Sequence, residues 1–371
     1  MTLELDSIEH AIAEIAAGRP VVVVDDQDRE NEGDLIMAAS LASPEWVGFF
    51  VRHTGGVLCA PVTLEDANRL QLAPMVSAND APLATAFTVS VDYREGLTTG
   101  ISAEERCNTV RALANHNAGA ADFVRPGHVF PLIAKEGGVL IRTGHTEAAI
   151  DLVRLAGLPP VGLISELVND DGSVQHGDAI QAFAEEYKLA LVSIDDLIAY
   201  RQAREKLVTR VSEETVQTSI GPARAIVYET PFDTSEHVAL FFGELGDGRG
   251  VLTRLHREDT VEDVFNNGTG AITQALERIK KAGRGVVVYL REGAVGVVGT
   301  SDRMRDANEN TGDGAKSDAA RHDQWREVGL GAQILNDLGI SSIRVISTME
   351  RQYVGLSGFD VEIEGTEIIP G

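Results

Sequence analysis

Cysteine is scarce in this chain of 371 residues, and only Cys59 and Cys107 occur. Two cysteines exclude a framework of several disulfides and a zinc site built from thiolates. Hydrophobic runs are short, and none reaches the roughly 20 apolar residues that cross a membrane as a helix. Residues 1–6 lack the basic and apolar segments of a signal peptide. These absences favour a cytoplasmic protein that is not inserted in a membrane.

Positive charge is also in deficit, because 32 Lys and Arg stand against 57 Asp and Glu and leave a net charge of −25. Such a charge argues against general nucleic-acid binding and against anionic membrane surfaces. An anionic substrate would therefore need local arginines, helix N-termini or a metal ion to overcome the surrounding field. The composition is otherwise that of an ordinary globular protein.

The length predicts two domains, and alternating helix and strand patterns predict a mixed α/β (α+β) fold in each. We expect a first domain at residues 1–203, a polar linker at 204–217 and a second domain at 218–371. The expected strands are 21–24, 56–62, 86–92, 138–141, 161–167, 189–194, 223–227, 237–242, 250–255, 285–290 and 342–346. The expected helices are 7–17, 46–52, 102–113, 147–155, 195–207, 270–282 and 325–338, with a surface loop at 299–323.

An acidic stretch follows directly after four consecutive valines, which are typical of a buried strand. Residues 25–34 hold six carboxylates and a single arginine, Arg29. Oxygen ligands on a loop attached to a rigid strand suit a hard divalent cation, and Arg29 is left to meet an anion. The alternative is a solvated acidic turn without function.

A second candidate site is Arg142-Thr143-Gly144-His145-Thr146, between an expected strand and an expected helix. Thr146 is expected to cap the helix, whose free N–H groups form an anion cradle. Gly144 permits close backbone approach, Arg142 can hold a phosphate or carboxylate, and His145 offers a metal ligand or proton shuttle. The alternative is a capped helix with a surface histidine.

Two further residues are candidate bases. Glu166 ends an apolar run, where burial would raise its pKa towards that of a useful general base, unless it lies on the solvent face of an edge strand. His128 follows a Pro-Gly turn and is a second candidate, although a histidine in such a place is more often structural. Cys59 is expected to be a small core residue.

The first half closely resembles 3,4-dihydroxy-2-butanone 4-phosphate synthase, an enzyme of riboflavin biosynthesis. The resemblance extends over residues 1 to about 203 and is specific as a set, although each motif alone is weak. Its motifs are residues 25–34, 85–90, 99–102 with Arg106, 125–131, 142–148 and 165–166.

This resemblance implies an enzyme dependent on Mg²⁺ (or Mn²⁺) that converts D-ribulose 5-phosphate to 3,4-dihydroxy-2-butanone 4-phosphate and formate. A divalent ion on vicinal oxygens of the ketose would stabilise an enediolate. The resemblance also implies a homodimer with composite active sites, in which Glu30 and His145 ligate the metal and His128 and Glu166 transfer protons. The implied substrate contacts are Arg29, Glu30, Asp34, Arg142, Thr143, Gly144, His145, Thr146 and Glu166.

The second half, from about residue 218, resembles GTP cyclohydrolase II but lacks its chemical groups. The three zinc cysteines of that family fall on Asp259, Gly270 and Ile272, of which only the first offers a side-chain donor. A tetrahedral zinc site therefore cannot form, and no zinc is expected. Further family motifs are altered at residues 291–296, 324–326 and 348–350. We predict that this half does not open the GTP ring.

Two alternatives stay open for the second half. It could retain cyclohydrolase activity through an unusual metal arrangement, which would make the chain bifunctional. It could instead be a nucleotide-sensing or interaction module that controls the first half.

Overall fold

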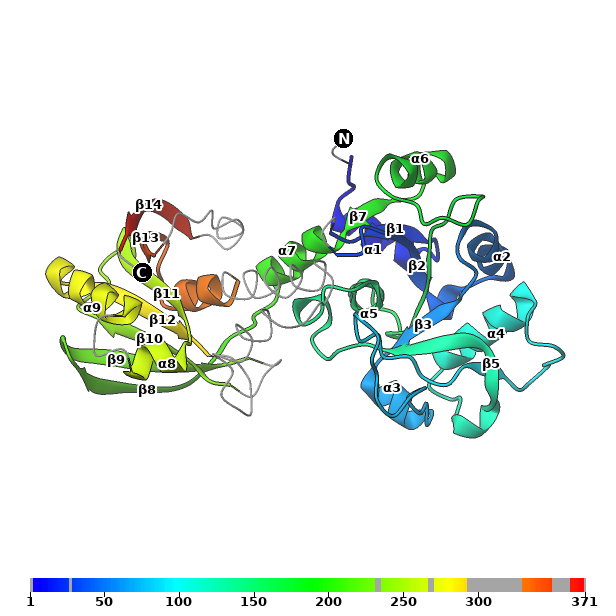
Figure 1. Cartoon of the computed structure of the whole chain (residues 1–371), viewed down its shortest axis with the longest axis horizontal. Helices are drawn as coiled ribbons and strands as arrows, with labels where there is room; N and C mark the ends of the chain where they lie inside the picture. Colours follow the sequence, from blue (N-terminus) through cyan, green and yellow to red (C-terminus); the bar gives the residue numbers. More distant parts are fainter. Residues whose placement is uncertain are drawn as a thin grey trace. The chain divides into compact units, whose positions relative to one another are not determined.

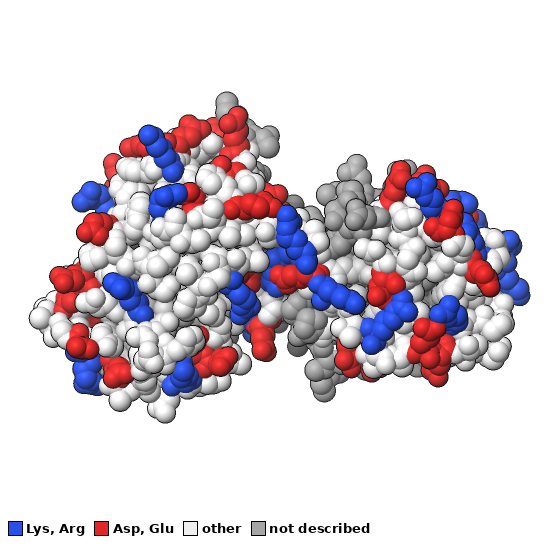
Figure 2. Space-filling view, turned by 180° about the vertical axis from the view of Figure 1, so that it is seen from behind, with Lys and Arg blue, Asp and Glu red and all other residues white. Residues whose placement is uncertain are grey.

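The computed structural model describes residues 3–26, 29–230, 235–265, 270–291, 329–348 and 361–369. These residues form two compact units, one up to Tyr200 and the other from Arg201 onward (Figure 1). Acidic and basic side chains are interspersed over the visible surface of each unit (Figure 2). None of the helices in the described ranges has the length and apolar character needed to span a bilayer.

The first unit is built on a mixed sheet of seven strands in the order β4-β5-β3-β6-β2-β1-β7. In chain order the strands are β1 (Val21–Val24), β2 (Gly33–Ala38), β3 (Cys59–Val62), β4 (Val91–Tyr93), β5 (Phe123–Ile133), β6 (Gly162–Glu166) and β7 (Leu191–Ser193). Its helices are α1 (Ile8–Ala16), α2 (Pro44–His53), α3 (Leu64–Arg69), α4 (Ala103–Leu113), α5 (His145–Leu155), α6 (Asp178–Tyr187) and α7 (Ile194–Arg204). The predicted mixed α/β class is confirmed.

The valine strand β1 is buried on both faces, which explains its unbroken apolar run. Val22 and Val24 belong to a core cluster that also contains side chains of α2, α4 and α6. Val21 and Val23 point the other way because side chains alternate along a strand. On that side lie α1 and α5, which contact both β1 and β2.

Helix α5 packs closely on the sheet at a glycine. A Cβ atom built on Gly162 of β6 would lie 2.9 Å from the Cβ of Ala149 in α5 and 3.7 Å from Pro61. The missing side chain therefore lets the helix approach the strand. This contact matters for function because α5 begins at His145.

The second unit has a seven-stranded sheet in the order β14-β13-β11-β12-β10-β9-β8, with α9 packed on β11 and β12. An apolar cluster that includes Leu252, Leu276, Ile279 and Val287 joins this helix to the sheet. The elements are β8 (Thr209–Thr218), β9 (Gly221–Glu229), β10 (His237–Phe242), β11 (Val251–Arg257), α8 (Thr260–Phe265), α9 (Ala271–Ala282), β12 (Gly285–Leu290), β13 (Ser342–Ser347) and β14 (Glu362–Ile368), and residues 329–337 are also helical.

Two predictions from the sequence are wrong. Residues 138–141 do not form a strand, because Gly137 and Gly138 have φ values of 93° and 65° and turn the chain into a short 3-10 helix. The carboxylate of Asp151 accepts the N–H of Val139 at 2.8 Å and holds this turn. The predicted polar linker at 204–217 contains most of β8, whose pairing with β9 makes an exposed edge strand out of polar residues.

Strands β2, β5, β8 and β14 and helices α3, α6 and α8 were not among the expected elements. The predicted strand at 86–92 is regular only from Val91. The predicted loop at 299–323 and residues 325–328 of a predicted helix lie outside the described residues. The predicted helix at 102–113 is confirmed as α4, which opens with a capping box between Ser102 and Glu105.

The close contact at Gly162 gives a test of the fold. We expect Gly162→Ala to lower the free energy of unfolding by about 1–3 kcal/mol, because the added methyl group must push α5 away from β6. The measurement is the thermal unfolding of the full chain by calorimetry.

Gly48 in α2 provides the matched control, because a Cβ atom added there would meet the Cβ of Ala103 at an ordinary contact distance of 3.9 Å. Gly48→Ala should be neutral or stabilising by up to about 1 kcal/mol, since alanine favours a helix. Equal stability of Gly162→Ala and the parent chain would contradict the packing argument.

Candidate active site

The acidic loop between β1 and β2 is organised by one buried carboxylate. The Asp25 side chain is 1 % exposed. One of its oxygens accepts the N–H of Glu32 at 2.8 Å, and the other accepts the N–H of Glu30 at 3.1 Å and the guanidinium of Arg29 at 2.8 Å. These bonds fold the described part of the loop back on itself, so this part is an ordered turn and not the solvated turn that was the alternative.

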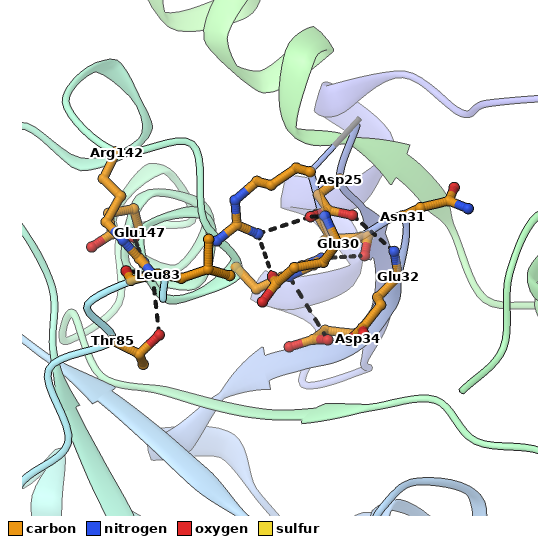
Figure 3. Close-up of polar contacts among 12 residues, drawn as sticks. Asp25, Glu30, Asn31, Glu32, Asp34, Leu83, Thr85, Arg142 and Glu147 are labelled. Carbon is orange, nitrogen blue, oxygen red and sulfur yellow. Dashed lines mark hydrogen bonds and ion pairs between the residues drawn. The ribbon is translucent and has the colours of Figure 1, made fainter. Parts of the chain in front are cut away.

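Asp25, Glu30 and His145 form a group whose ligand atoms all lie within 4.8 Å of one another. Nδ1 of His145 is 3.8 Å from Glu30 Oε2 and 3.8 Å from Asp34 Oδ1. Figure 3 shows the carboxylates of Asp25, Glu30 and Asp34 gathered in one place. The two segments that the sequence singles out, the acidic loop and the turn at 142–146, therefore meet here.

The orientation of the His145 ring favours ligation. Nε2 lies 3.1 Å from the carbonyl oxygen of Val23 in β1, which can only accept a hydrogen bond. Nε2 therefore carries a proton, and Nδ1 is the nitrogen that faces the carboxylates. An imidazole fixed in this way presents a lone pair to a cation once Nδ1 is deprotonated.

The pKa values of the cluster follow from burial opposed by charge. Burial acts to raise the pKa of Glu30, but the nearby His145 and the charge of Arg29 outweigh burial and lower it to about 2. Burial alone would lower the pKa of His145, but Asp34 and Glu30 raise it to about 9. A buried imidazolium thus balances the carboxylates.

Asp34 and Glu166 are direct neighbours in the antiparallel pairing of β2 with β6. Burial raises the pKa of Asp34 to about 8, and the charges of Glu166 and Glu30 add to this while His145 opposes it. Oδ1 of Asp34 is buried without a hydrogen-bond partner in the described part of the chain. An orphaned carboxylate oxygen beside other acids indicates a place for a cation.

The donor set fits a hard divalent ion. Carboxylate oxygens with a single imidazole suit Mg²⁺ or Mn²⁺, and Mg²⁺ commonly takes only one or two protein ligands and keeps several waters. Glu30 and His145, the predicted metal ligands, both belong to the cluster, and Asp25 is a member that the sequence analysis did not single out. The sequence feature that could have identified Asp25 is its position immediately after the valine strand.

Arg29 and Arg142 are both engaged within the chain. Arg29 is 4 % exposed and also contacts Glu30 through its guanidinium. Arg142 pairs with Glu147 at 2.6 Å and donates to the carbonyl of Leu83 and to Thr85, both at 3.2 Å (Figure 3). Arg142 thereby ties the turn before α5 to the segment around Thr85, which belongs to another sequence motif.

The turn at 142–146 differs from its expected form in two ways. It follows the short 3-10 helix at residues 138–140 rather than a strand. Gly144 is the N-cap of α5, and Thr146, which was expected to cap the helix, is a buried residue of its first turn. Thr143 lies half-buried just before this N-cap. The helix N-terminus is nevertheless next to the acidic cluster, as expected.

His128 lies apart from this cluster in the sheet, on β5, and β3 and β6 separate it from β2. Nδ1 of His128 is 2.7 Å from Oδ2 of Asp92, and its backbone N–H donates to Oδ1 of Asp92 at 2.7 Å. The structure thus gives His128 a buried carboxylate partner that sequence reasoning missed. Asp92 sits at the end of an alternating strand pattern and gave no separate signal.

In the second unit, the positions of the family's zinc cysteines lie at the starts of two helices, one at α8 and two at α9. Asp259 precedes α8, Gly270 is the N-cap of α9, and Ile272 packs against the apolar cluster beneath α9. Nearby, Asp263 accepts from Tyr289 at 2.7 Å and contacts Nε2 of His256 at 2.9 Å. The motifs altered at 292–296, 324–326 and 349–350 lie outside the described residues.

The fold and cluster define the class of protein as a two-unit α/β chain with a candidate divalent-cation site in its first unit. Family comparison is more specific. Residues 9–200 match the model for 3,4-dihydroxy-2-butanone 4-phosphate synthase, and residues 209–370 match the model for GTP cyclohydrolase II. The chain belongs to the 3,4-dihydroxy-2-butanone 4-phosphate synthase family and carries a second domain of the GTP cyclohydrolase II family.

Similar proteins cover nearly the whole chain. The riboflavin biosynthesis protein RibBA of Salinispora arenicola is 48 % identical over 98 % of this chain and 89 % of its own length. A monofunctional riboflavin biosynthesis protein, RIBA 2 of Arabidopsis thaliana, is 46 % identical over 97 % of this chain and 76 % of its own length.

Two solved structures are also similar. RibBX from A. baumannii, a two-domain 3,4-dihydroxy-2-butanone 4-phosphate synthase, has a TM-score of 0.82 and 35 % identity, and the match covers 98 % of this chain and 100 % of RibBX. A 3,4-dihydroxy-2-butanone 4-phosphate synthase solved with two magnesium ions has a TM-score of 0.53 and 44 % identity, over 54 % of this chain and 98 % of its own.

The electrostatics of the cluster predict that cation binding depends on pH. Below pH 8 the raised pKa of His145 keeps Nδ1 protonated, so a cation must displace that proton. We expect the Mn²⁺ dissociation constant to fall at least about tenfold for each unit of pH between 6 and 8. Calorimetric titrations in buffers of different ionisation enthalpy would count the protons released.

His10→Gln is the control, because His10 also lies beside carboxylates, those of Asp6 and Glu14, but is half exposed. It should not alter the proton count. A dissociation constant independent of pH in the parent chain would rule out His145 as a ligand.

Proposed function

We propose that this protein converts D-ribulose 5-phosphate to 3,4-dihydroxy-2-butanone 4-phosphate and formate, with Mg²⁺ or Mn²⁺ held by Glu30 and His145. The observation that carries the proposal is the cluster of Asp25, Glu30 and His145, which comes from two separate family motifs. The family match over residues 9–200 supports the choice of reaction. The enzyme would be a lyase that acts in riboflavin biosynthesis.

The chain's own residues divide the work. A divalent ion at the cluster would stabilise negative charge that develops on substrate oxygens. Glu166, which lies at the end of β6 and opposite Asp34, would take a proton from a substrate carbon held there. The N-terminus of α5 would hold the anionic end of the sugar phosphate, and Arg29 would join it by giving up a contact with Asp25 or Glu30.

We further propose a homodimer in which His128 of one copy completes the site of the other. Within one chain, β3 and β6 lie between the strand of His128 and β2 of the acidic cluster. If His128 and Glu166 of one site came from different copies, both would reach the same substrate although they lie on separate strands of one chain. The proposal also agrees with the composite sites that the family resemblance implies.

The second domain is proposed to be inactive as a GTP cyclohydrolase. Gly270 and Ile272, at two of the three zinc-cysteine positions, cap a helix and pack in an apolar cluster, and neither carries a donor side chain. The contacts of Asp263 with His256 and Tyr289 support a folded scaffold rather than a zinc site. The name of RibBX, a two-domain 3,4-dihydroxy-2-butanone 4-phosphate synthase, points in the same direction.

Formate release tests the first proposal. Glu30→Gln and His145→Ala should each lower kcat/KM by about 100-fold or more, because several kcal/mol of charge stabilisation is lost. Glu166→Gln should lower kcat by about 10²–10⁴-fold and leave KM nearly unchanged, as expected for a lost base. Activity is measured as formate produced from ribulose 5-phosphate with and without Mg²⁺.

Glu104→Gln is the matched control, an exposed carboxylate on α4 away from the cluster. It should have parental activity. Full activity in Glu30→Gln or His145→Ala would refute the metal assignment, and full activity in Glu166→Gln would reassign the base.

The inactivity of the second domain has its own test. We expect the full chain, given GTP with Zn²⁺ or Mg²⁺, to release neither formate nor a diaminopyrimidine, while the same sample turns over ribulose 5-phosphate. Chromatography of the products separates the two reactions. A diaminopyrimidine that disappears in Asp259→Ala would establish the bifunctional alternative instead.

A further inference from the structure

His128 poses a problem of orientation. Its side chain is 40 % exposed, and an exposed imidazole can rotate and can carry its proton on either nitrogen. A proton-transfer residue needs one orientation and one tautomer. Asp92, on β4, supplies both.

Two hydrogen bonds to a single buried carboxylate, that of Asp92, provide this constraint. The Asp92 side chain is 4 % exposed. One of its oxygens accepts the backbone N–H of His128 and the other pairs with Nδ1 of the His128 ring, each at 2.7 Å. The first bond fixes the position of the main chain of His128, and the second fixes its ring. Since an ionised carboxylate can only accept, the shared proton belongs to Nδ1.

The surrounding backbone is shaped to bring the two residues together. The pairing of β4 with β5 is irregular between Val91 and Asp92, so residues 125–128 lie opposite this junction. Gly127 passes so close to the backbone of Val91 that a Cβ atom would overlap it, and its N–H donates to Ser90 at 3.1 Å. A larger residue at position 127 would force the strands apart.

A second glycine, Gly100, packs against the pair formed by Asp92 and His128. Gly100 has a φ of 83°, and a Cβ atom there would overlap Oδ2 of Asp92 and crowd Nδ1 of His128. The Arg106 side chain, from α4, interacts electrostatically with Asp92. Gly100 and Arg106 both belong to the family motif at residues 99–102 with Arg106. No residue of that motif belongs to the cluster of Asp25, Glu30 and His145.

We infer that Asp92 is a positioning residue for His128, which holds the proton on Nδ1 and presents Nε2 to the substrate. The inference rests on the proton-transfer role that the proposed function gives to His128. Nε2 then accepts a proton from the substrate, the resulting imidazolium stays paired with the Asp92 carboxylate, and the same proton is returned from Nε2 in a later step. No other reactant is needed.

The tautomer of His128 tests this inference in the unmodified protein. Long-range ¹H–¹⁵N spectra of chain labelled with ¹⁵N-histidine distinguish the two ring nitrogens, and His128→Gln assigns the signal. At a pH where the ring is neutral, we expect the proton on Nδ1 and an unprotonated Nε2. A ring protonated on Nε2 would overturn the inference without any other variant.

Asp92→Asn tests the consequence for catalysis. The amide keeps the shape but can donate to Nδ1, so we expect a shift of the His128 proton to Nε2. Formate production should then fall by about 10²–10⁴-fold in kcat, with KM within a few-fold of the parent value. Gly100→Ala, which crowds the pair from outside, should lower kcat in the same sense.

Ser90→Ala is the matched control, because Ser90 supports the same turn through Gly127 without touching the ring. It should keep the parental tautomer and a kcat within a few-fold. Losses in Asp92→Asn no larger than those in Ser90→Ala would overturn the role of Asp92. Full activity in His128→Gln would instead overturn the role of His128 itself and with it the proposed proton transfer.

Discussion

The structure of the first unit depends on a balance of charge in a buried place. Asp25, Glu30, Asp34 and Glu166 converge at the ends of β1, β2 and β6, where like charges repel and burial penalises each of them. His145 offsets this repulsion as an imidazolium, since Asp34 and Glu30 raise its pKa to about 9. A divalent cation would offset it more fully, which is why the cluster suits a metal.

The rest of the unit serves this balance. The approach of α5 to the sheet at Gly162 places its first residue, His145, beneath the carbonyl of Val23, and that contact orients the ring. The buried Asp25 folds the acidic loop towards the same place. The geometry of the site therefore depends on two packing features as much as on its charged groups. These are the close contact of Gly162 with α5 and the hydrogen bonds from the loop backbone to Asp25.

Much of the fold was predictable because its signals are local. The four valines, the capping box at Ser102 and the helix after His145 follow from hydrophobic periodicity and capping rules, and the structure contains all three. Strand β8 was missed because it is an edge strand made of polar residues, whose only reason to be extended is its pairing with β9. The turn at Gly137 and Gly138 carries a strand-like pattern, because the three apolar residues after it, at 139–141, outweigh the glycines in the sequence.

By itself, the sequence determined which chemical groups are available: an acidic loop with one arginine, a histidine at a helix start, and a second half without zinc cysteines. Motif order was enough to indicate the family. Only the tertiary structure decided which groups meet. It brought Asp25 and His145 within ligand distance although 120 residues separate them along the chain, and it paired His128 with Asp92 across two strands. Such contacts depend on strand register and helix packing, which no local pattern records.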